Sequence, residues 1–380
     1  MKILISGGHL TPALAIIDYI QTHQYEDEIV YVGRIYSQEK NKQLSVELDE
    51  IEKRQGDLRS KRGCPGVNVK FISLSAAKLR NFSLFKFIKS VLYSYKIIRR
   101  EKPDVFLSFG GFVAIPLACA AYFARVPIIT HEQTRSVGKA NKFVAKFAKI
   151  VALSFADSKK YFPGKKTKVI GNPIREKIYQ KEHKKPNWFN KTGQPLLLVM
   201  GGNQGSLIIN NTIKESLSSL LADYSIVHAC GRATKLHHYK QELLDQAALL
   251  SQPEQDRYYV REWLSDDELF YFYQQADLAI SRAGANTVHE IAIANVPTIF
   301  IPLPFAHHDE QRLNAKWLVN QKAALILEQE KLSVESLKEQ IDILAASKKE
   351  LITNLKQIEI NRTANKELYY LLQQLAAKTV

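Results

Sequence analysis

The sequence contains few cysteines. Its 380 residues include only Cys64, Cys119 and Cys230, which lie far apart and show no paired spacing. Disulfide frameworks and cysteine-based zinc sites need paired or closely spaced cysteines, so neither is indicated. We therefore expect three reduced thiols.

The sequence also lacks a hydrophobic run long enough to cross a membrane. The apolar segment from Phe112 to Phe123 is well short of the roughly 20 residues that a transmembrane helix needs. The chain enters a strand-like segment, Lys2 to Ser6, without the pattern of a signal peptide. These features predict a soluble, cytoplasmic protein.

Several short nucleotide- and metal-binding motifs are missing. The sequence contains neither G-x-G-x-x-G, the dinucleotide fingerprint, nor G-K-[ST], the P-loop signature. It also contains no Asp-x-Asp motif that could hold a metal ion beside a diphosphate. We therefore expect no metal and no other cofactor.

Acidic residues are outnumbered by basic ones. The chain has 53 Lys and Arg against 38 Asp and Glu, a formal net charge of +15. This balance favours anionic partners, namely nucleic acid, acidic lipid headgroups or phosphorylated substrates. Between Lys70 and Lys102, nine basic residues accompany one acid, Glu101, which predicts a local basic face.

Short β-branched runs alternate with helical patterns along the chain, which is typical of parallel α/β layers. Because 380 residues exceed one ordinary hydrophobic core, we expect two Rossmann-like domains. The polar passage 168–195 predicts an interdomain linker, and the charged segment 36–66 predicts an insertion. The stretch from Leu332 onward predicts consecutive helices. The predicted strands are 2–6, 29–33, 69–74, 105–109, 127–130, 150–155, 196–200, 225–230, 257–260, 277–281, 298–302 and 324–327.

Glycine pairs end three of these strands. They are Gly7-Gly8, Gly110-Gly111 and Gly201-Gly202. After the first pair, Thr11 is a plausible N-cap and Pro12 suits a first helical turn, so a helix should begin just after His9. The N–H groups of this turn would face an anionic ligand at the open end of the sheet. On its own, His9 fits a structural turn residue better than a catalytic base.

A polar triplet, His131-Glu132-Gln133, follows another predicted strand at the same sheet edge. Three polar side chains in a row cannot all belong to the core. Glu132 or Gln133 could cap the helix that contains Asn141, or could belong to a site. The residues alone leave both interpretations open.

The second half repeats the arrangement of strand, glycine turn and helix. The segment LLLVMGGNQGSLIINNTI places bare N–H groups from Asn203 to Ser206 at a helix start, which favours a diphosphate. A second helix starting near Ala285 puts Glu290 in its second turn, where a carboxylate can accept hydrogen bonds from ribose hydroxyls. The alternative for Glu290 is an exposed helix charge.

Seven passages together resemble the MurG glycosyltransferase family. They are GGHLTPALA, PDVFLSFGGFVAIP, PIITHEQTRSVGKANK, VIGNPIRE, MGGNQGSLIIN, SRAGANTVHEIAIANVPTIFIPLP and DEQRLNA, and they occur in the family's order over most of the chain. The resemblance implies an α/β protein of GT-B architecture, in which two Rossmann-like domains face each other with parallel sheets across a cleft. The implied domains are an acceptor- and membrane-binding domain, 1–171 joined by a C-terminal helix 362–380, and a UDP-GlcNAc-binding domain, 172–361.

The resemblance also implies a reaction. The family moves N-acetylglucosamine (GlcNAc) from UDP-GlcNAc to undecaprenyl-diphosphate-linked muramyl-pentapeptide in peptidoglycan synthesis. It implies that Glu290 binds the ribose, that Leu264 lies by the uracil, and that Arg175 lies on the linker beside the nucleotide. The implied substrate-binding residues are Ser6, Gly7, Gly8, Thr134, Asn141, Arg175, Gly202, Asn203, Gln204, Leu264, Ala285, Asn286, Thr287, Glu290 and Gln311.

Three passages depart from the family's pattern. The first turn, Gly7-Gly8-His9, is shorter than the family's G-G-T-G-G-H. Thr134 replaces the last residue of H-E-Q-N, and Asn203 replaces the serine of G-G-S-Q-G. These changes bear on the choice of acceptor and donor sugar.

We expect an inverting transfer, in which the acceptor hydroxyl attacks the anomeric carbon and UDP leaves from the opposite face. The helix starts after Gly201-Gly202 and at Ala285 would stabilise the leaving diphosphate without a metal. A base must take the acceptor's proton. His9 is the first candidate, because imidazole accepts protons near neutral pH, and Glu132 is the second.

The basic segment 76–100 has two interpretations. Either it is an ordinary amphipathic surface helix, with a core stripe of Leu84, Ile88, Val91, Tyr95 and Ile98, or it also binds a membrane. The family resemblance favours peripheral binding at the cytoplasmic face of the cell membrane. The predicted contacts with anionic lipid are Lys78, Arg80, Phe82, Phe85, Lys86 and Lys89.

Three alternative functions remain at this stage. One is a GT-B transferase that acts on another lipid acceptor, such as a diacylglycerol. Another is a nucleotide-sugar-binding protein without catalysis, which the shortened first turn suggests. The third is a nucleic-acid-binding protein, but the sequence shows no nucleic-acid motif and its glycine turns lie where small ligands bind, so we expect no nucleic-acid partner.

Overall fold

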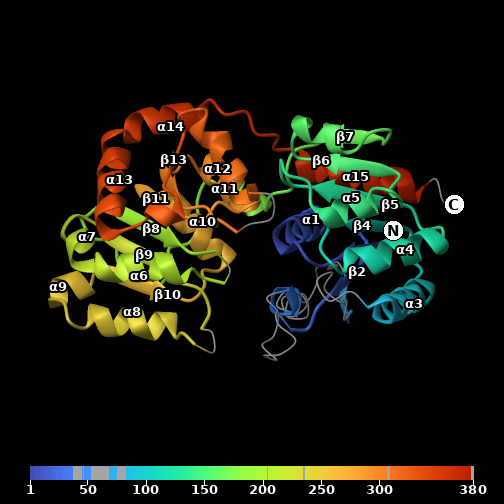
Figure 1. The fold of residues 1–380 in the computed structure, drawn as a ribbon, viewed down its shortest axis with the longest axis horizontal. Coiled ribbons are helices and arrows are strands. Elements are labelled where there is room, and N and C mark those ends of the chain that lie inside the picture. The colour runs from blue at the N-terminus through green and yellow to red at the C-terminus, as the bar shows by residue number, and fades with distance from the viewer. Residues whose placement is uncertain are drawn as a thin grey trace. The chain divides into compact units, whose positions relative to one another are not determined.

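The computed structural model describes residues 1–36, 45, 47–52, 68–74, 83–202, 204–233, 236–305 and 309–377. The chain divides into two compact units (Figure 1). The first unit consists of Met1–Glu176 with Asn361–Val380, and the second of Lys177–Ile360. The C-terminal helix thus belongs to the first unit.

The first unit is built on a seven-stranded parallel sheet in the order β3-β2-β1-β4-β5-β6-β7. Its strands are β1 (Lys2–Ser6), β2 (Glu28–Gly33), β3 (Asn68–Ser73), β4 (Val105–Ser108), β5 (Ile128–Glu132), β6 (Ile150–Leu153) and β7 (Thr167–Val169). Its helices are α1 (Leu10–Thr22), α3 (Leu84–Glu101), α4 (Ala114–Phe123), α5 (Lys139–Val144) and α15 (Ala364–Ala376), with a short 3-10 helix, η2 (Ala156–Tyr161).

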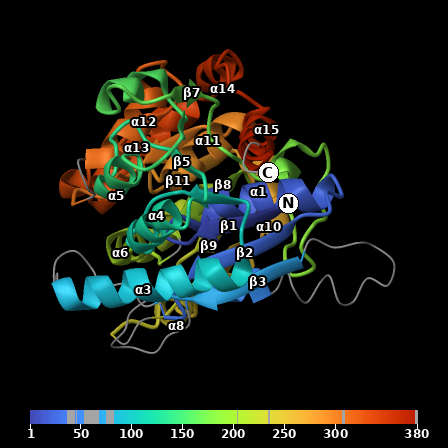
Figure 2. The same ribbon diagram turned by 90° about the vertical axis from the view of Figure 1, so that its right-hand side faces the viewer.

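Helices cover both faces of this sheet, because neighbouring residues of a strand point to opposite sides. Ile3 and Ile5 of β1 pack in a core that α1 and α15 complete. Leu4 packs in a second core, completed by α3, α4 and α5. Figures 1 and 2 show α3 beside α4 and α15 beside α1.

The second unit has a six-stranded parallel sheet in the order β10-β9-β8-β11-β12-β13. Its strands are β8 (Leu196–Met200), β9 (Ser225–Ala229), β10 (Tyr258–Arg261), β11 (Leu278–Ser281), β12 (Thr298–Phe300) and β13 (Leu325–Ile326). Its helices are α6 (Leu207–Glu215), α7 (Leu217–Asp223), α8 (Tyr239–Ala247), α9 (Gln252–Gln255), α10 (Asp266–Gln275), α11 (Ala285–Ala294), α12 (Glu310–Val319), α13 (Val334–Ala346) and α14 (Lys348–Lys356), with 3-10 helices η3 (Glu176–Tyr179), at its start, and η5 (Gln329–Lys331).

The structure confirms all twelve predicted strands and the consecutive C-terminal helices. It adds β7, which the sequence analysis placed partly in the linker. This strand has three residues, two of them exposed, and lies at the edge of the sheet, so it lacks the apolar run that predicts a buried strand. Among the described residues, no helix is both long and apolar enough to cross a bilayer.

The predicted core stripe of α3 is wrong at three of its five positions. Leu84, Ile88 and Tyr95 are exposed, whereas Ile98 is buried as predicted, and the helix also buries two serines and a glutamate. The buried positions are Ser90, Ser94, Ile97, Ile98 and Glu101. The reason is that α3 packs against the alanine-rich α4, and the two serines allow close approach of the helices.

Candidate functional site

Two glycine turns meet at the carboxyl edge of the first unit's sheet. They follow β1 and β4, which are neighbours, with Ser6 paired to Ser108. Gly8 has φ +126°, and a Cβ on it would lie 3.0 Å from the carbonyl oxygen of Gly110. Only glycine combines this backbone with such a close approach, which explains both Gly-Gly pairs.

His9 lies directly after the first turn, and α1 begins at Leu10 as predicted. Thr11 is not the N-cap, because the chain leaves β1 so sharply that His9 takes that position and Thr11 is already helical. The His9 side chain makes no capping hydrogen bond and is exposed. The Ser6 hydroxyl next to the turn is buried, with no hydrogen-bond partner in the described part of the chain.

Glu47, which the sequence analysis did not single out, supports this turn. Its carboxylate accepts hydrogen bonds from the backbone N–H of Gly8, at 2.8 Å, and of Arg34, at 3.3 Å. Burial raises the pKa of the neighbouring Tyr31 well above its usual value, and the Glu47 carboxylate adds to this effect. Because Gly7 donates to the carbonyl of Val32, the expected anion-binding N–H groups of Gly7 and Gly8 already have partners within the protein.

Glu132 organises the loop between β5 and α5. Its carboxylate accepts hydrogen bonds from Thr134 N, Thr134 Oγ1, Gly138 N and Asn141 Nδ2, at 3.0, 2.9, 3.1 and 2.9 Å. Gly138 is the N-cap residue of α5, so Glu132 does cap the helix that contains Asn141. The carboxylate is buried, and its oxygens are occupied by these four donors.

Asn141 and His131 complete this buried cluster. Because His131, Glu132 and Gln133 are all buried, the expectation that three polar side chains in a row cannot all belong to the core is wrong. The Asn141 amide accepts from Thr130 Oγ1 at 2.9 Å and donates to the carbonyl of His131 at 3.2 Å. The imidazole of His131 lies 3.0 Å from the carbonyl oxygen of Gly171. Arg175 is buried in the first unit, just before the boundary with the second.

A second pair of turns meets at the carboxyl edge of the other sheet, after β8 and β9. Gly205 has φ +73°, and a Cβ on it would lie only 2.2 Å from the carbonyl oxygen of Cys230. Ser206 is the N-cap of α6. Gly202 and Gln204 are exposed in this turn, whereas Asn203 lies outside the described residues.

Arg282 connects this turn to the adjacent strand, β11. It donates to Ser206 Oγ and Gln329 Oε1, both at 2.7 Å, and to the carbonyl oxygens of Ile301 and Pro302 at 3.0 and 3.2 Å. Burial lowers its pKa to about 10, so the guanidinium stays charged at neutral pH. The sequence analysis missed Arg282, although an arginine directly after a buried strand was a signal for it.

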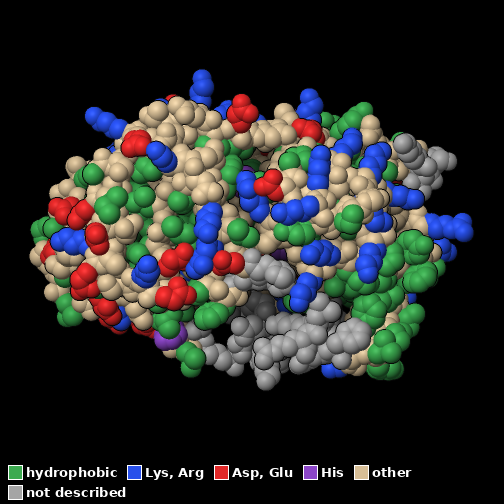
Figure 3. Space-filling model, turned by 45° about the horizontal axis from the view of Figure 1, so that its top comes forward, with side chains coloured by type: hydrophobic (Ala, Val, Ile, Leu, Met, Phe, Trp, Pro, Cys, Tyr) green, Lys and Arg blue, Asp and Glu red, His purple; other side chains and the backbone are tan. Residues whose placement is uncertain are grey.

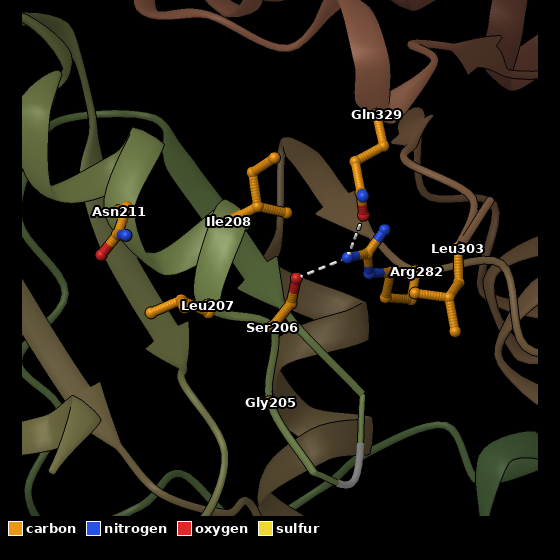
Figure 4. Close-up of a pocket in the computed structure, with 8 residues that line it drawn as sticks. All are labelled: Gly205, Ser206, Leu207, Ile208, Asn211, Arg282, Leu303 and Gln329. Atoms are coloured by element: carbon orange, nitrogen blue, oxygen red, sulfur yellow. Dashed lines mark hydrogen bonds between the residues drawn. The ribbon is translucent and has the colours of Figure 1, made fainter. Parts of the chain in front are cut away.

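A pocket of about 530 Å³ lies beside Arg282 (Figure 4). Its lining residues are Gly205, Ser206, Leu207, Ile208, Asn211, Arg282, Leu303 and Gln329. The hydrogen bonds from the guanidinium cross between the turn after β8 and η5 (Figure 4).

The start of α11 contains the other residues expected around the nucleotide. Ala285, Asn286 and Thr287 form its first turn. Glu290 is buried, and the hydroxyl of Tyr273 lies 3.4 Å from its carboxylate, so the alternative of an exposed helix charge is wrong.

Two further predicted residues have structural contacts. Gln311 on α12 accepts a hydrogen bond from the backbone N–H of Leu303 at 3.0 Å, which ties the loop after β12 to that helix. Leu264, just before α10, is buried.

The second unit therefore places two helix N-termini, those of α6 and α11, after adjacent strands, with a buried arginine between them. Such an arrangement attracts a diphosphate, and a nearby carboxylate can hold a ribose. Within the described ranges, no group of three or more His, Cys, Asp or Glu side chains could hold a metal ion.

Known proteins are similar to this chain in sequence and in fold. Residues 6–153 match the glycosyltransferase family 28 N-terminal domain, and residues 196–368 match the C-terminal domain of the same family. A Clostridium novyi protein named UDP-N-acetylglucosamine--N-acetylmuramyl-(pentapeptide) pyrophosphoryl-undecaprenol N-acetylglucosamine transferase is 32% identical, with 96% of each chain covered. A Clostridium botulinum protein of the same name is 33% identical, with 92% of each covered.

Among solved structures, Acinetobacter baumannii MurG matches with a TM-score of 0.67 and 25% identity, covering 98% of this chain and 99% of that one. This likeness, together with the two parallel-sheet units, confirms the predicted α/β fold class.

Proposed function

The chain belongs to the MurG family of family 28 glycosyltransferases, and from this membership we propose its reaction and the residues that carry it. The protein is an N-acetylglucosaminyltransferase of peptidoglycan synthesis. It moves GlcNAc from UDP-GlcNAc to the lipid-linked N-acetylmuramyl-pentapeptide.

We assign the donor site to the carboxyl edge of the second unit's sheet. The observation that carries this assignment is the 2.7 Å hydrogen bond from Arg282 to Ser206, which joins the starts of α6 and α11 beside an open pocket. The diphosphate of UDP-GlcNAc then lies against these two helix N-termini, and Glu290 accepts hydrogen bonds from the ribose. Leu264 faces the uracil, and Thr287 and Gln311 face the sugar.

The transfer forms a bond between the acceptor oxygen and the anomeric carbon, and breaks the bond between that carbon and the diphosphate. Negative charge grows on the leaving UDP, where the helix N-termini and the Arg282 guanidinium stabilise it. We assign to His9, whose imidazole is exposed, the role of taking the proton of the acceptor hydroxyl. Glu132 has a positioning role, because its oxygens already accept four hydrogen bonds from the 134–141 loop.

A hydrophobic surface on α3 and α4 supports peripheral membrane binding by the first unit. Phe85 is 78% exposed and Phe123 is 71% exposed, and Leu84 and Leu92 are also exposed. We call Leu84, Phe85, Ile88, Leu92, Tyr93, Tyr122 and Phe123 the α3–α4 patch.

Basic residues accompany the α3–α4 patch. Lys86 and Lys89 are exposed on the same helix, and Figure 3 shows Lys and Arg side chains near hydrophobic ones at this end of the unit. Apolar side chains that enter the lipid interface, next to lysines that attract anionic headgroups, suit an enzyme whose acceptor carries a lipid. We place this contact at the cytoplasmic face; the predicted residues Lys78, Arg80 and Phe82 lie outside the described residues.

Incubation with radiolabelled UDP-GlcNAc and undecaprenyl-diphospho-muramyl-pentapeptide tests this function. We expect a lipid product that is heavier by one N-acetylhexosamine, and free UDP in equal amount. A labelled diacylglycerol from mixed membrane lipids would instead identify the other acceptor class. UDP binding without turnover on either acceptor would identify a binding protein, and the absence of both would refute the proposal.

A further inference from the structure

A buried chain of polar side chains runs beneath the glycine turn after β8. Tyr258 of β10, His228 of β9 and Asn210 of α6 are all buried. His228 Nδ1 lies 2.9 Å from the Tyr258 hydroxyl, and His228 Nε2 lies 3.0 Å from Asn210 Oδ1. Asn210 Nδ2 in turn donates to the carbonyl oxygen of Cys230 at 2.9 Å. These hydrogen-bonded side chains thus link the edge strand of the sheet, β10, to the turn after β9.

The hydrogen bonds in this chain have one consistent direction. A carbonyl only accepts, so Asn210 presents its nitrogen to Cys230 and its oxygen to His228. His228 therefore donates from Nε2, and its Nδ1 accepts from the Tyr258 hydroxyl. Burial lowers the pKa of His228 to about 3, which keeps the imidazole neutral. The donor atoms of these three side chains, Tyr258 Oη, His228 Nε2 and Asn210 Nδ2, each have one acceptor.

The last acceptor, the Cys230 carbonyl, is part of the surface on which the glycine turn rests. Gly205 packs so closely on this carbonyl that a Cβ would approach it to 2.2 Å. The Gly201 N–H also donates to the carbonyl oxygen of Ala229, at 3.3 Å. A shift of Cys230 would therefore displace the turn, because no side chain separates the two backbones.

We propose that Tyr258, His228 and Asn210 are positioning residues for UDP-GlcNAc, which act through the Cys230 carbonyl on the backbone of the Gly201–Ser206 turn. The inference rests on the proposed function, in which this turn holds the diphosphate. Backbone N–H groups bind an anion well only when their directions are fixed in advance, so a loosened turn binds UDP more weakly.

The test compares UDP affinity in full-length variants by titration calorimetry. Asn210→Leu keeps the side-chain shape but removes both hydrogen bonds, and His228→Leu removes the centre of the chain. We expect the Kd for UDP to rise about tenfold in each variant, because a buried polar group without its partner destabilises the backbone that supports the turn.

Thr298→Val is the matched control. Thr298 is fully buried at the start of β12, which lies between β11 and the edge strand β13 of the same sheet, and its hydroxyl donates to the carbonyl of Val296 at 2.8 Å. This variant also loses one buried hydrogen bond and should lower the melting temperature. Its Kd for UDP should stay at the wild-type value.

A rescue variant separates positioning from general loss of stability. In the variant His228→Gln, the glutamine nitrogen can donate to Asn210 and its oxygen can accept from the Tyr258 hydroxyl, so no buried partner loses its hydrogen bond. We expect its Kd for UDP within about threefold of wild type, because the link to Cys230 remains.

Two results would overturn the inference: wild-type UDP affinity in Asn210→Leu, or equal weakening in Asn210→Leu and Thr298→Val. If His228→Leu does not fold, Asn210→Leu and the rescue variant still decide the question. Failure of the wild-type protein to bind UDP would refute the proposed function instead.

Discussion

Gly205→Ala should destabilise the second unit far more than Gly202→Ala, although the two glycines lie in the same turn. Both residues have positive φ, +73° and +83°, so alanine at either position adopts a left-handed backbone. They differ in their surroundings. A Cβ on Gly205 would lie 2.2 Å from the Cys230 carbonyl oxygen, whereas a Cβ on Gly202 meets no described atom within 4 Å.

The magnitudes follow from these two environments. The left-handed backbone costs alanine about 1–2 kcal/mol, and about 0.4–1 kcal/mol is regained because alanine restricts the unfolded chain. Gly202→Ala should therefore lower the free energy of unfolding by about 1 kcal/mol or less. Gly205→Ala must also move two backbones apart, an overpacking cost of about 1–3 kcal/mol, so its total loss is about 2–4 kcal/mol.

Tryptophan fluorescence during urea unfolding measures this difference. All three tryptophans, Trp188, Trp263 and Trp317, belong to the second unit, so the signal reports on that unit alone. The free energies come from the transition midpoints and slopes. Losses for Gly205→Ala and Gly202→Ala that agree within about 0.5 kcal/mol would refute the close-contact argument.

Four further predictions concern catalysis, nucleotide binding, membrane binding and pH. His9→Ala should lower kcat by about 100-fold or more without changing the Kd for UDP, because a base acts only in the chemical step. Glu290→Gln should weaken UDP binding about tenfold in calorimetry, because an amide is a poorer acceptor for ribose hydroxyls than a carboxylate. Phe85→Ser combined with Phe123→Ser should weaken binding to anionic vesicles at least tenfold in sedimentation assays, since burial of each exposed ring in the lipid interface contributes about 2 kcal/mol of binding free energy. The free energy of unfolding of the second unit should fall by roughly 1 kcal/mol per pH unit as the pH drops below 6.5, because unfolded His228 then binds a proton that the folded residue, with its pKa of about 3, does not.

Each of these predictions has its own control. Full activity of His9→Ala would remove the imidazole from the mechanism. Dideoxy-UDP should bind Glu290→Gln and wild type equally, and a persisting difference would contradict the ribose contact. Tyr370→Ser, an exposed aromatic residue on α15 at the other face of the sheet, should leave vesicle binding unchanged. The His228→Gln variant should lose the acid sensitivity, and an unchanged slope would assign it to other groups.

Local patterns in the sequence predicted most of the fold. The strands were recognisable because a buried parallel strand is a short apolar run, and the run is visible without any knowledge of its neighbours. The glycine pairs marked the turns at the sheet edges, and the structure shows that close backbone contacts, such as Gly8 with Gly110, require them. The motifs around Glu290 and the glycine turn after β8 identified the family.

What the sequence did not reveal depends on partners far away in the chain. Glu47 supports the turn before His9 across 39 positions, and nothing in its surrounding charged segment distinguished it from a surface residue. Glu132 could cap a helix or serve a site, and only the tertiary structure revealed the four hydrogen bonds that its carboxylate accepts from the 134–141 loop.

The buried face of α3 was misjudged for a related reason. Leu84, Ile88 and Tyr95 of the predicted stripe have helical spacing, but α4 packs on the face of α3 that carries Ser90 and Ser94, so these three larger side chains stay exposed. Arg282 likewise joins the turn after β8 to η5, 47 residues further along the chain. Sequence by itself determined most of the strands and the glycine turns at their ends, because those depend on neighbouring residues. The tertiary structure decided which polar groups are buried together, because hydrogen bonds and packing join residues that the sequence keeps apart.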